Sequence, residues 1–484
     1  MVFPPLALLF FFFLSLPLCS QAPLPSPSAL ADLLEVMPGL PSPDLLIQAG
    51  AGRPPAAPLQ SSPRTGMAEM PTRCTHWFQL HRAPVTLVAT LLILLAIWTL
   101  QHRMLTTSLP KALAVKSESG VSSSPPAKQV GRMDPPRAHH IVFLKTHKTG
   151  GSTVQNLLFR LGEKERLTFA FPYASFQFFY PARFQAAFVD ELPLASSHFD
   201  VLCSHTRLDL EELGKVMPAD SVYLTILRDP ATAFESLFSY YQNSIPAFSK
   251  VSAATGSGNM TALLSAFLEM PEFYYNASSP GNGLAKNPMT FDLGLDNQEW
   301  APTWPEMLEQ LSQAFQLVMI AEYFDESLIL LKDILGLEYE DLVYVKLNLR
   351  QNSYKSPVTE DLLARMQSWN SLDHLLYSYF KEVFWERVRR YGLQRMAREV
   401  SVLKSLLKET RHLCLQEQAL PPGELGEMTR PFQPETAIIL GYAVQRNLTE
   451  DDAYFCLRLV LPELQYHTHL YFQQYKREVP GIED

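Results

Sequence analysis

The stretch HIVFLKTHKTGGST, residues 140–153, joins a short apolar run to a glycine-containing turn. The run 140–145 suits a buried strand, and the apolar spacing of residues 152–161 (STVQNLLFRL) predicts a helix after the turn. A strand, a glycine turn and a helix in this order present backbone N–H groups and a helix N-terminus to a phosphate. The stretch therefore predicts an α/β fold with a phosphate site. The alternative is an ordinary strand-to-helix turn with a solvated lysine.

The side chains of this turn include groups that bind anions. Lys148 lies in the turn itself, and Ser152 and Thr153 are placed either to cap the helix or to donate to a phosphate. The turn is not a Walker A loop, because that motif needs its lysine directly before the hydroxyl residue. No Gly-Lys-Ser or Gly-Lys-Thr occurs in the chain. This argues against an ATPase or a small-molecule kinase.

A second strand-to-helix unit contains an arginine and a serine at a suggestive spacing. The run 221–227 (SVYLTIL) is rich in β-forming residues and is followed by a predicted helix. Arg228 lies at the end of the strand and Ser236 about two turns into the helix. Both can face one bound group at the carboxyl edge of the sheet, where open α/β sheets bind ligands. The alternative for Arg228 is an ion pair with Asp229 or Glu235.

Two histidines are candidates for a general base. A short strand at 200–204 (DVLCS) ends at His205, and His147 lies within the phosphate turn. A histidine just past a strand end is well placed to take a proton, with an ordinary pKa near 6.5. We take His205 as the candidate base and His147 as its rival. The alternative for His205 is a structural hydrogen-bonding role.

The rest of the predicted body completes a central, mostly parallel sheet flanked by helices. Glu322 follows a strand, where it either orients a catalytic group or complements a helix dipole. Residues 346–355 (KLNLRQNSYK) offer further donors on a loop, and residues 247–305, rich in Gly, Asn and Pro, are expected to shape an acceptor cleft. The other predicted elements are a strand at 315–321, a helix at 327–335 and helices at 359–412.

Two apolar stretches precede this body. Residues 1–20 resemble a signal-peptide core, and residues 83–100 are uncharged and long enough to span a bilayer. The Ser/Pro/Lys-rich residues 101–138 read as a flexible stem, which leaves residues 139–484 as the folded domain. The acceptor asparagines of three glycosylation sequons, Asn259, Asn276 and Asn447, all follow the second stretch. They favour a luminal domain held by a single type II anchor.

A cleaved signal before that anchor would instead place the domain in the cytosol. The conflict disappears if the protein starts at Met67 or Met70, so that residues 1–66 are an alternative extension of a tail that ends at residue 82. The other interpretation makes the first apolar stretch a second membrane-associated arm.

Composition excludes some classes of function. The net charge is -9 with a pI of about 5.8, and no basic stripe is visible, which argues against general nucleic-acid binding. The five cysteines have no zinc-site spacing, so no metal is predicted. In an oxidising lumen, Cys414 and Cys456 are predicted to form a disulfide, and Cys203, in a buried strand, is predicted to be free.

Four segments together resemble one known family. They are residues 140–162 (HIVFLKTHKTGGSTVQNLLFRLG), 200–210 (DVLCSHTRLDL), 222–241 (VYLTILRDPATAFESLFSYY) and 317–335 (LVMIAEYFDESLILLKDIL). They resemble the galactose 3-O-sulfotransferases, Golgi type II membrane enzymes that use 3′-phosphoadenylyl sulfate. The similarity runs from about residue 139 to about residue 470. It implies a P-loop-like sulfotransferase fold and transfer of a sulfuryl group to the 3-hydroxyl of galactose, with no metal required.

The resemblance also implies the roles of individual residues. Lys148 stabilises charge on the bridging oxygen of the donor, Arg228 and Ser236 bind its 3′-phosphate, and His205 is the base. The residues implied to bind the 5′-phosphosulfate are Lys145, Thr146, Lys148, Thr149, Gly150, Gly151, Ser152 and Thr153. One departure is the pair Gly150-Gly151, which stands where members often carry Ala-Ser or Ser-Gly. A second glycine loosens the turn but keeps its N–H groups available.

Within the family, the resemblance favours the branch that acts on galactosylceramide or related galactolipids at the Golgi membrane. The alternatives are sulfation of terminal β-galactose on glycoprotein glycans, and a non-catalytic paralogue that only binds glycans. Nothing in the sequence predicts the oligomeric state.

Overall fold

The computed structural model describes residues 137–256 and 259–478. The bilayer span predicted at 83–100, the extension before it and nearly all of the stem lie outside the described residues. Among the helices of the described part, none is both long and apolar enough to cross a membrane.

A four-stranded parallel sheet forms the centre of the molecule, in the order β2-β1-β3-β4. Its strands are β1 (Ile141–Leu144), β2 (Val201–Leu202), β3 (Val222–Leu227) and β4 (Leu317–Ile320). Ile141 pairs with both Val201 and Val222, and Leu224 pairs with Leu317. Every residue of β1 and β4 is buried, as expected for strands covered on both faces. The predicted α/β class and parallel sheet are confirmed.

Helices follow the strands at their carboxyl ends. They are α2 (Gly151–Glu165) after β1, α4 (Pro230–Tyr241) after β3 and α10 (Phe324–Leu335) after β4. Asp229 caps α4 by accepting a hydrogen bond from the N–H of Thr232 at 3.0 Å, and Pro230 occupies the first turn. These strand-to-helix turns bring Lys148 and Arg228 to one edge of the sheet.

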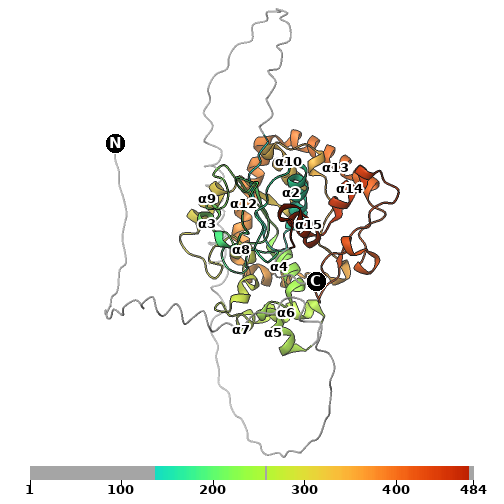
Figure 1. Ribbon diagram of the computed structural model, residues 1–484. Helices are drawn as coiled ribbons and strands as arrows, with labels where there is room; N and C mark the ends of the chain where they lie inside the picture. Colours follow the sequence, from blue (N-terminus) through green and yellow to red (C-terminus); the bar gives the residue numbers. More distant parts are fainter. Residues whose placement is uncertain (1–136, 257–258, 479–484) are drawn as a thin grey trace, which may run out of the picture. The chain divides into compact units, whose positions relative to one another are not determined.

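The main core is closed by four C-terminal helices: α12 (Ser371–Tyr391), α13 (Leu393–Cys414), α14 (Glu450–Val460) and α15 (Glu463–Tyr475). Figure 1 shows α2 with α15 and α14 beside it, while α13 packs on α10 and α12 packs on β4. A disulfide joins Cys414 at the end of α13 to Cys456 in α14, the pair that the sequence suggested. Cys203 is free and buried. The disulfide thus links α13 to α14, and α14 in turn packs on α2.

Residues 247–305, expected from sequence to shape a cleft, form helices with their own hydrophobic cluster. Phe267 of α6 contacts Phe234, Phe248 and Trp369 through ring edges or tilted faces. The helices around this cluster are α4, α5 (Pro246–Thr255), α6 (Met260–Glu269), α7 (Pro271–Tyr274) and α11 (Glu360–Trp369). α5, α6 and α7 lie together at the lower side of the body in Figure 1. The other α-helices and strands of the described residues are α3 (Leu210–Leu213), α8 (Pro288–Asp292), α9 (Trp304–Ala314), β5 (Leu349–Arg350) and β6 (Ile439–Leu440).

Candidate active site

The turn between β1 and α2 has the backbone shape of an anion-binding nest. Lys148 and Gly150 are both left-handed, with φ of 58° and 95°. Alternating backbone handedness turns consecutive N–H groups toward one point. The N–H groups of Lys148, Thr149 and Gly150 donate to no acceptor in the described part of the chain, and α2 has no side-chain cap. These N–H groups are free to donate hydrogen bonds to a bound phosphate or sulfate.

The two positions Gly150 and Gly151 favour glycine for different physical reasons. Gly150 occupies a left-handed conformation that costs other L-residues energy. At Gly151, an added Cβ would lie 2.8 Å from Cγ of Lys145, too close for an undisturbed contact. The absence of a side chain at Gly151 therefore lets the turn pack closely against Lys145. This is a packing role, in addition to the flexibility that a second glycine gives the turn.

The hydroxyl groups predicted to bind the donor are bonded within the protein. The bonds run from Thr146 Oγ1 to Ile226 O (2.5 Å), from Thr149 Oγ1 to Thr146 O (3.2 Å), from Ser152 Oγ to Glu463 (3.1 Å) and from Leu347 N to Thr153 Oγ1 (3.2 Å). Thr146 and Thr149 are also fully buried. These bonds hold the turn in shape, and its backbone N–H groups and Lys148 remain available to an anion.

Lys145 likewise faces inward. Its Nζ donates to Gln155 Oε1 at 2.8 Å and forms an ion pair with Glu463 of α15. The side chain is 1% exposed, so a charge there needs this partner. Lys145 therefore supports the turn from beneath, and the carboxylate of Glu463 partly offsets its positive charge.

Three cations converge beside the turn. Arg228 donates from Nη1 to the carbonyl oxygen of Lys148 at 3.0 Å. It makes neither of the ion pairs weighed from the sequence, because Asp229 caps α4 and Glu235 pairs with Arg350. Burial, and then the neighbouring charges of Arg350, Arg228 and Lys145, together lower the pKa of Lys148 to about 7. Such a like-charge cluster is stabilised by a bound anion.

Arg350 has donors left over. It is 8% exposed, one nitrogen pairs with Glu235, and its Nε and Nη1 have no hydrogen-bond partner among the described residues. Buried guanidinium groups with unused donors are uncommon without a ligand. The position of Arg350 next to Lys148 and Arg228 makes it a third candidate for binding phosphate.

Ser236 lies on the side of α4 that faces this cluster. It precedes Tyr240 by one helical turn, so the two side chains share a face. The ammonium of Lys148 stands 3.6 Å from the centre of the Tyr240 ring. The predicted role of Ser236 beside Arg228 stays a prediction, and its position on α4 is compatible with it.

His205 presents one free nitrogen to the site. Its Nδ1 lies 2.9 Å from the carbonyl oxygen of Lys145 and must donate to it, which leaves a lone pair on Nε2. Burial, and then the nearby His147, Lys145 and Lys148, hold the pKa of His205 well below its ordinary value, so the ring is neutral. A neutral imidazole with a free Nε2 is competent to accept a proton.

His147, the rival base, stacks on His205 with ring centres 4.1 Å apart. Its Nδ1 and its backbone N–H both bind the carboxylate of Asp292, at 3.0 Å and 2.7 Å. Tyr180 donates to the same carboxylate at 2.7 Å. His147 is 3% exposed, whereas His205 is partly exposed. Solvent access favours His205 for contact with an acceptor and His147 for its support.

Four residues of this site were not predicted from the sequence: Tyr240, Asp292, Arg350 and Glu463. Arg350 fell within the donor-rich segment 346–355, which was a usable signal. No sequence signal pointed to Asp292 or Glu463. Asp292 is distant along the chain from His147, which it contacts, and Glu463 is likewise distant from Lys145. Glu322 accepts hydrogen bonds from the N–H of Asp229 and from Tyr377, so it braces two elements.

The three sequon asparagines, Asn259, Asn276 and Asn447, are all exposed. Asn259 also caps α6 by accepting from the N–H of Ala262 at 2.9 Å. That bond uses the side-chain oxygen, so the nitrogen remains accessible. Surface accessibility is thus compatible with glycosylation at each position.

The chain is an α/β protein whose candidate site lies at the carboxyl edge of a parallel sheet, where such sheets bind ligands. Comparison with known proteins gives the particular family. The family model for galactose-3-O-sulfotransferase matches residues 70–474. The chain belongs to the galactose-3-O-sulfotransferase family, and it is an enzyme that transfers sulfate to galactose.

Several relatives are similar over most of their length. Galactose-3-O-sulfotransferase 3 of Mus musculus is 39% identical over 73% of this chain and 82% of its own. Galactosylceramide sulfotransferase of Homo sapiens is 38% identical over 72% of this chain and 84% of its own. Galactose-3-O-sulfotransferase 2 of Sus scrofa is 38% identical over 72% of this chain and 88% of its own.

Proposed function

We propose that the enzyme moves the sulfuryl group of 3′-phosphoadenylyl sulfate to the 3-hydroxyl of a galactose residue in galactosylceramide or a related galactolipid. The observation that carries this proposal is the convergence of Lys148, Arg228 and Arg350 on a turn with free N–H groups, next to the neutral ring of His205.

The donor suits the site because it carries anionic groups at two places. The turn N–H groups and Lys148 fit the 5′-phosphosulfate. Arg228, Ser236 and the unused donors of Arg350 fit the 3′-phosphate. ATP lacks a phosphate at that position, so it would leave Arg350 with buried, unpaired donors. Electrostatics thereby select this donor over ATP.

The chemistry follows from these positions. The galactose 3-hydroxyl oxygen forms a bond to sulfur as the bond between sulfur and the bridging phosphate oxygen breaks, and adenosine 3′,5′-bisphosphate leaves. Nε2 of His205 takes the hydroxyl proton. Lys148 and the turn N–H groups stabilise the negative charge that grows on the leaving phosphate oxygen. His147, held by Asp292, keeps the His205 ring in place by stacking.

The acceptor is the finer part of the proposal. A galactosylceramide sulfotransferase is among the relatives, which supports a galactolipid. A second candidate acceptor is the terminal β-galactose of a glycoprotein glycan, because relatives that are not named for a lipid are equally similar.

We also propose that the domain is luminal and anchored in the Golgi membrane as a single-pass type II protein. The disulfide and the three exposed sequon asparagines support an oxidising, glycosylating compartment. Treatment of intact, sealed membranes with protease should leave the domain uncut until detergent is added. Cleavage without detergent would place it in the cytosol.

The reaction is tested with the full-length protein in detergent and radiolabelled donor, comparing galactosylceramide with free β-galactoside oligosaccharides. Label on galactosylceramide that disappears when the 3-hydroxyl is blocked supports the proposal. Label on oligosaccharides alone would show that the acceptor is a glycan and not a galactolipid. A folded protein that binds adenosine 3′,5′-bisphosphate but labels neither acceptor contradicts it.

We predict that His205→Ala lowers kcat at least about 100-fold, since a general base contributes at least that much. Binding of adenosine 3′,5′-bisphosphate should stay near normal, because His205 faces the acceptor. The matched control is His374→Ala, at an exposed position on α12. Equal kcat for the two variants would remove His205 from the chemistry.

A further inference from the structure

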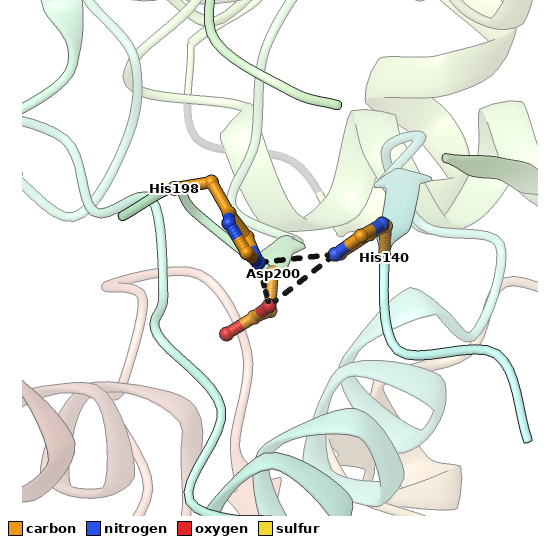
Figure 2. Close-up of side chains that lie close together, drawn as sticks. All are labelled: His140, His198 and Asp200. Atoms are coloured by element: carbon orange, nitrogen blue, oxygen red, sulfur yellow. Dashed lines mark hydrogen bonds and ion pairs between the residues drawn. The ribbon is translucent and has the colours of Figure 1, made fainter. Parts of the chain in front are cut away.

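Three side chains meet at the amino-terminal edge of the sheet, opposite the candidate active site. His140 directly precedes β1, and Asp200 directly precedes β2. His198 lies two residues before Asp200, so its ring can reach the same edge. Figure 2 shows the two imidazole rings and the carboxylate turned toward one another. None of these residues takes part in the proposed reaction.

The distances between their facing atoms match a metal site. Nε2 of His140 lies 3.2 Å from Nε2 of His198. Oδ1 of Asp200 lies 3.2 Å from Nε2 of His198 and 3.6 Å from Nε2 of His140. Ligands bonded to tetrahedral Zn²⁺ at about 2.0–2.1 Å are about 3.3 Å apart. The three atoms therefore already form one face of a tetrahedron of the right size.

Each of the three side chains is held from behind. Nδ1 of His140 lies 2.7 Å from Oδ1 of Asp220, and Nδ1 of His198 lies 2.8 Å from Oγ of Ser197. The other oxygen of Asp200 accepts the N–H of Thr168 at 2.6 Å. Outer partners of this kind orient metal ligands and set the tautomer of a ligating histidine.

This arrangement makes a cation between the rings favourable. The carboxylate of Asp220 can only accept a hydrogen bond from Nδ1–H of His140, which leaves a lone pair on Nε2 of His140. If Nδ1 of His198 likewise donates to Ser197, two lone pairs face each other at 3.2 Å. A metal ion between them turns that repulsion into two bonds. The metal-free alternative is a hydrogen bond from Nε2 of His198 to Asp200 and His140.

We propose that His140, His198 and Asp200 bind one Zn²⁺ ion, with water as the fourth ligand. An open hollow of about 520 Å³, lined by all three residues, gives the ion a path from solvent. The ion joins the segment that carries His198 to the starts of β1 and β2, so its binding stabilises the folded chain. The sequence predicted no metal because 58 residues separate the two histidines, far from any zinc-site spacing.

The test uses the full-length protein in detergent, stripped with a chelator and free of a polyhistidine tag, with Co²⁺ and Zn²⁺ as probes. The wild type should bind one equivalent of Co²⁺ with the intense visible bands of a tetrahedral site, and Zn²⁺ should displace it. His198→Ala, at an exposed position, should weaken binding at least tenfold. Asp220→Asn, which leaves all three ligands in place, should weaken it by about 10- to 100-fold.

His139→Ala is the matched control, since His139 is an exposed neighbour that lies outside the triad. It should bind as the wild type does. Zn²⁺ should also raise the melting temperature of the wild type but leave that of His198→Ala unchanged. Absence of saturable binding at one equivalent, or equal binding by the wild type and His198→Ala, overturns the proposal and leaves a hydrogen-bonded triad.

Discussion

Lys148 has a left-handed backbone conformation, and only about half of its side chains carry a positive charge near pH 7. Burial and the neighbouring cations lower its pKa to about 7. A polyanionic donor would reverse the effect of those cations and raise the pKa again. The residue thus couples protonation to donor binding.

We predict that the affinity for adenosine 3′,5′-bisphosphate falls as the pH rises from about 7 to about 9. The pKa of Lys148 is about 7 in the free enzyme and higher in the complex. Binding therefore takes up a proton in this range, and Kd rises by at most about tenfold per pH unit. Calorimetric titration across this range measures the slope. Lys148→Arg keeps its charge and should give a flat profile; the same slope in that variant would assign it to another group.

A second prediction concerns Gly151 and the affinity of the turn for the donor. Gly151→Ala should weaken donor binding, because its Cβ would lie 2.8 Å from Cγ of Lys145 and the turn must shift to accommodate it. The control is Gly423→Ala, where an added Cβ meets no atom within 4 Å. The measurement is Kd for adenosine 3′,5′-bisphosphate. Equal values for both variants would show that the turn tolerates the methyl group.

At the scale of elements, the parallel sheet separates two sets of residues by strand direction. The carboxyl ends of β1 and β3 lead to Lys148 and Arg228, and the amino ends of β1 and β2 lead to the histidine–aspartate triad. The short helix α8 adds a further link. Its first residues donate to Asp373 of α12, and its last residue, Asp292, holds His147. An element of one and a half turns thus positions the support of the candidate base.

The disulfide between α13 and α14 should contribute strongly to stability. It spans 42 residues, for which loop closure in the unfolded chain predicts up to about 4 kcal/mol. The double variant Cys414→Ala and Cys456→Ala should unfold at a lower temperature under non-reducing conditions and should not respond to a reductant. Cys203→Ala, at the free buried cysteine, is the control and should still respond. An unchanged melting temperature in the double variant would contradict a stabilising role.

At the scale of the whole molecule, the end of the described chain completes the site at its beginning. Glu463 of α15 pairs with Lys145 and accepts from Ser152, both beside the phosphate turn. Asn156 of α2 donates to the carbonyl oxygens of Arg458 and Leu461, which fixes the approach of the C-terminal helices. The donor turn is therefore stabilised by contacts across more than 300 residues.

Glu463→Gln should lower the free energy of unfolding by about 3 kcal/mol, because it leaves the buried charge of Lys145 without its counter-ion. Denaturant unfolding of the full-length protein measures this loss. Glu450→Gln, at the exposed start of α14, is the control and should cost little. If the two variants are equally stable, the ion pair contributes nothing and Lys145 is held by Gln155 alone.

Local sequence was sufficient for the sheet and for the two strand-to-helix turns that carry Lys148 and Arg228. Strand and helix signals are short-range, so apolar runs and turn residues at 140–161 and 221–241 carried them. The disulfide pair also followed from few cysteines and an expected lumen. Asp292, Glu463 and the facing nitrogens of His140 and His198 were decided only by tertiary structure. Their partners are distant along the chain, and burial and charge coupling act through space, where sequence spacing contains no information.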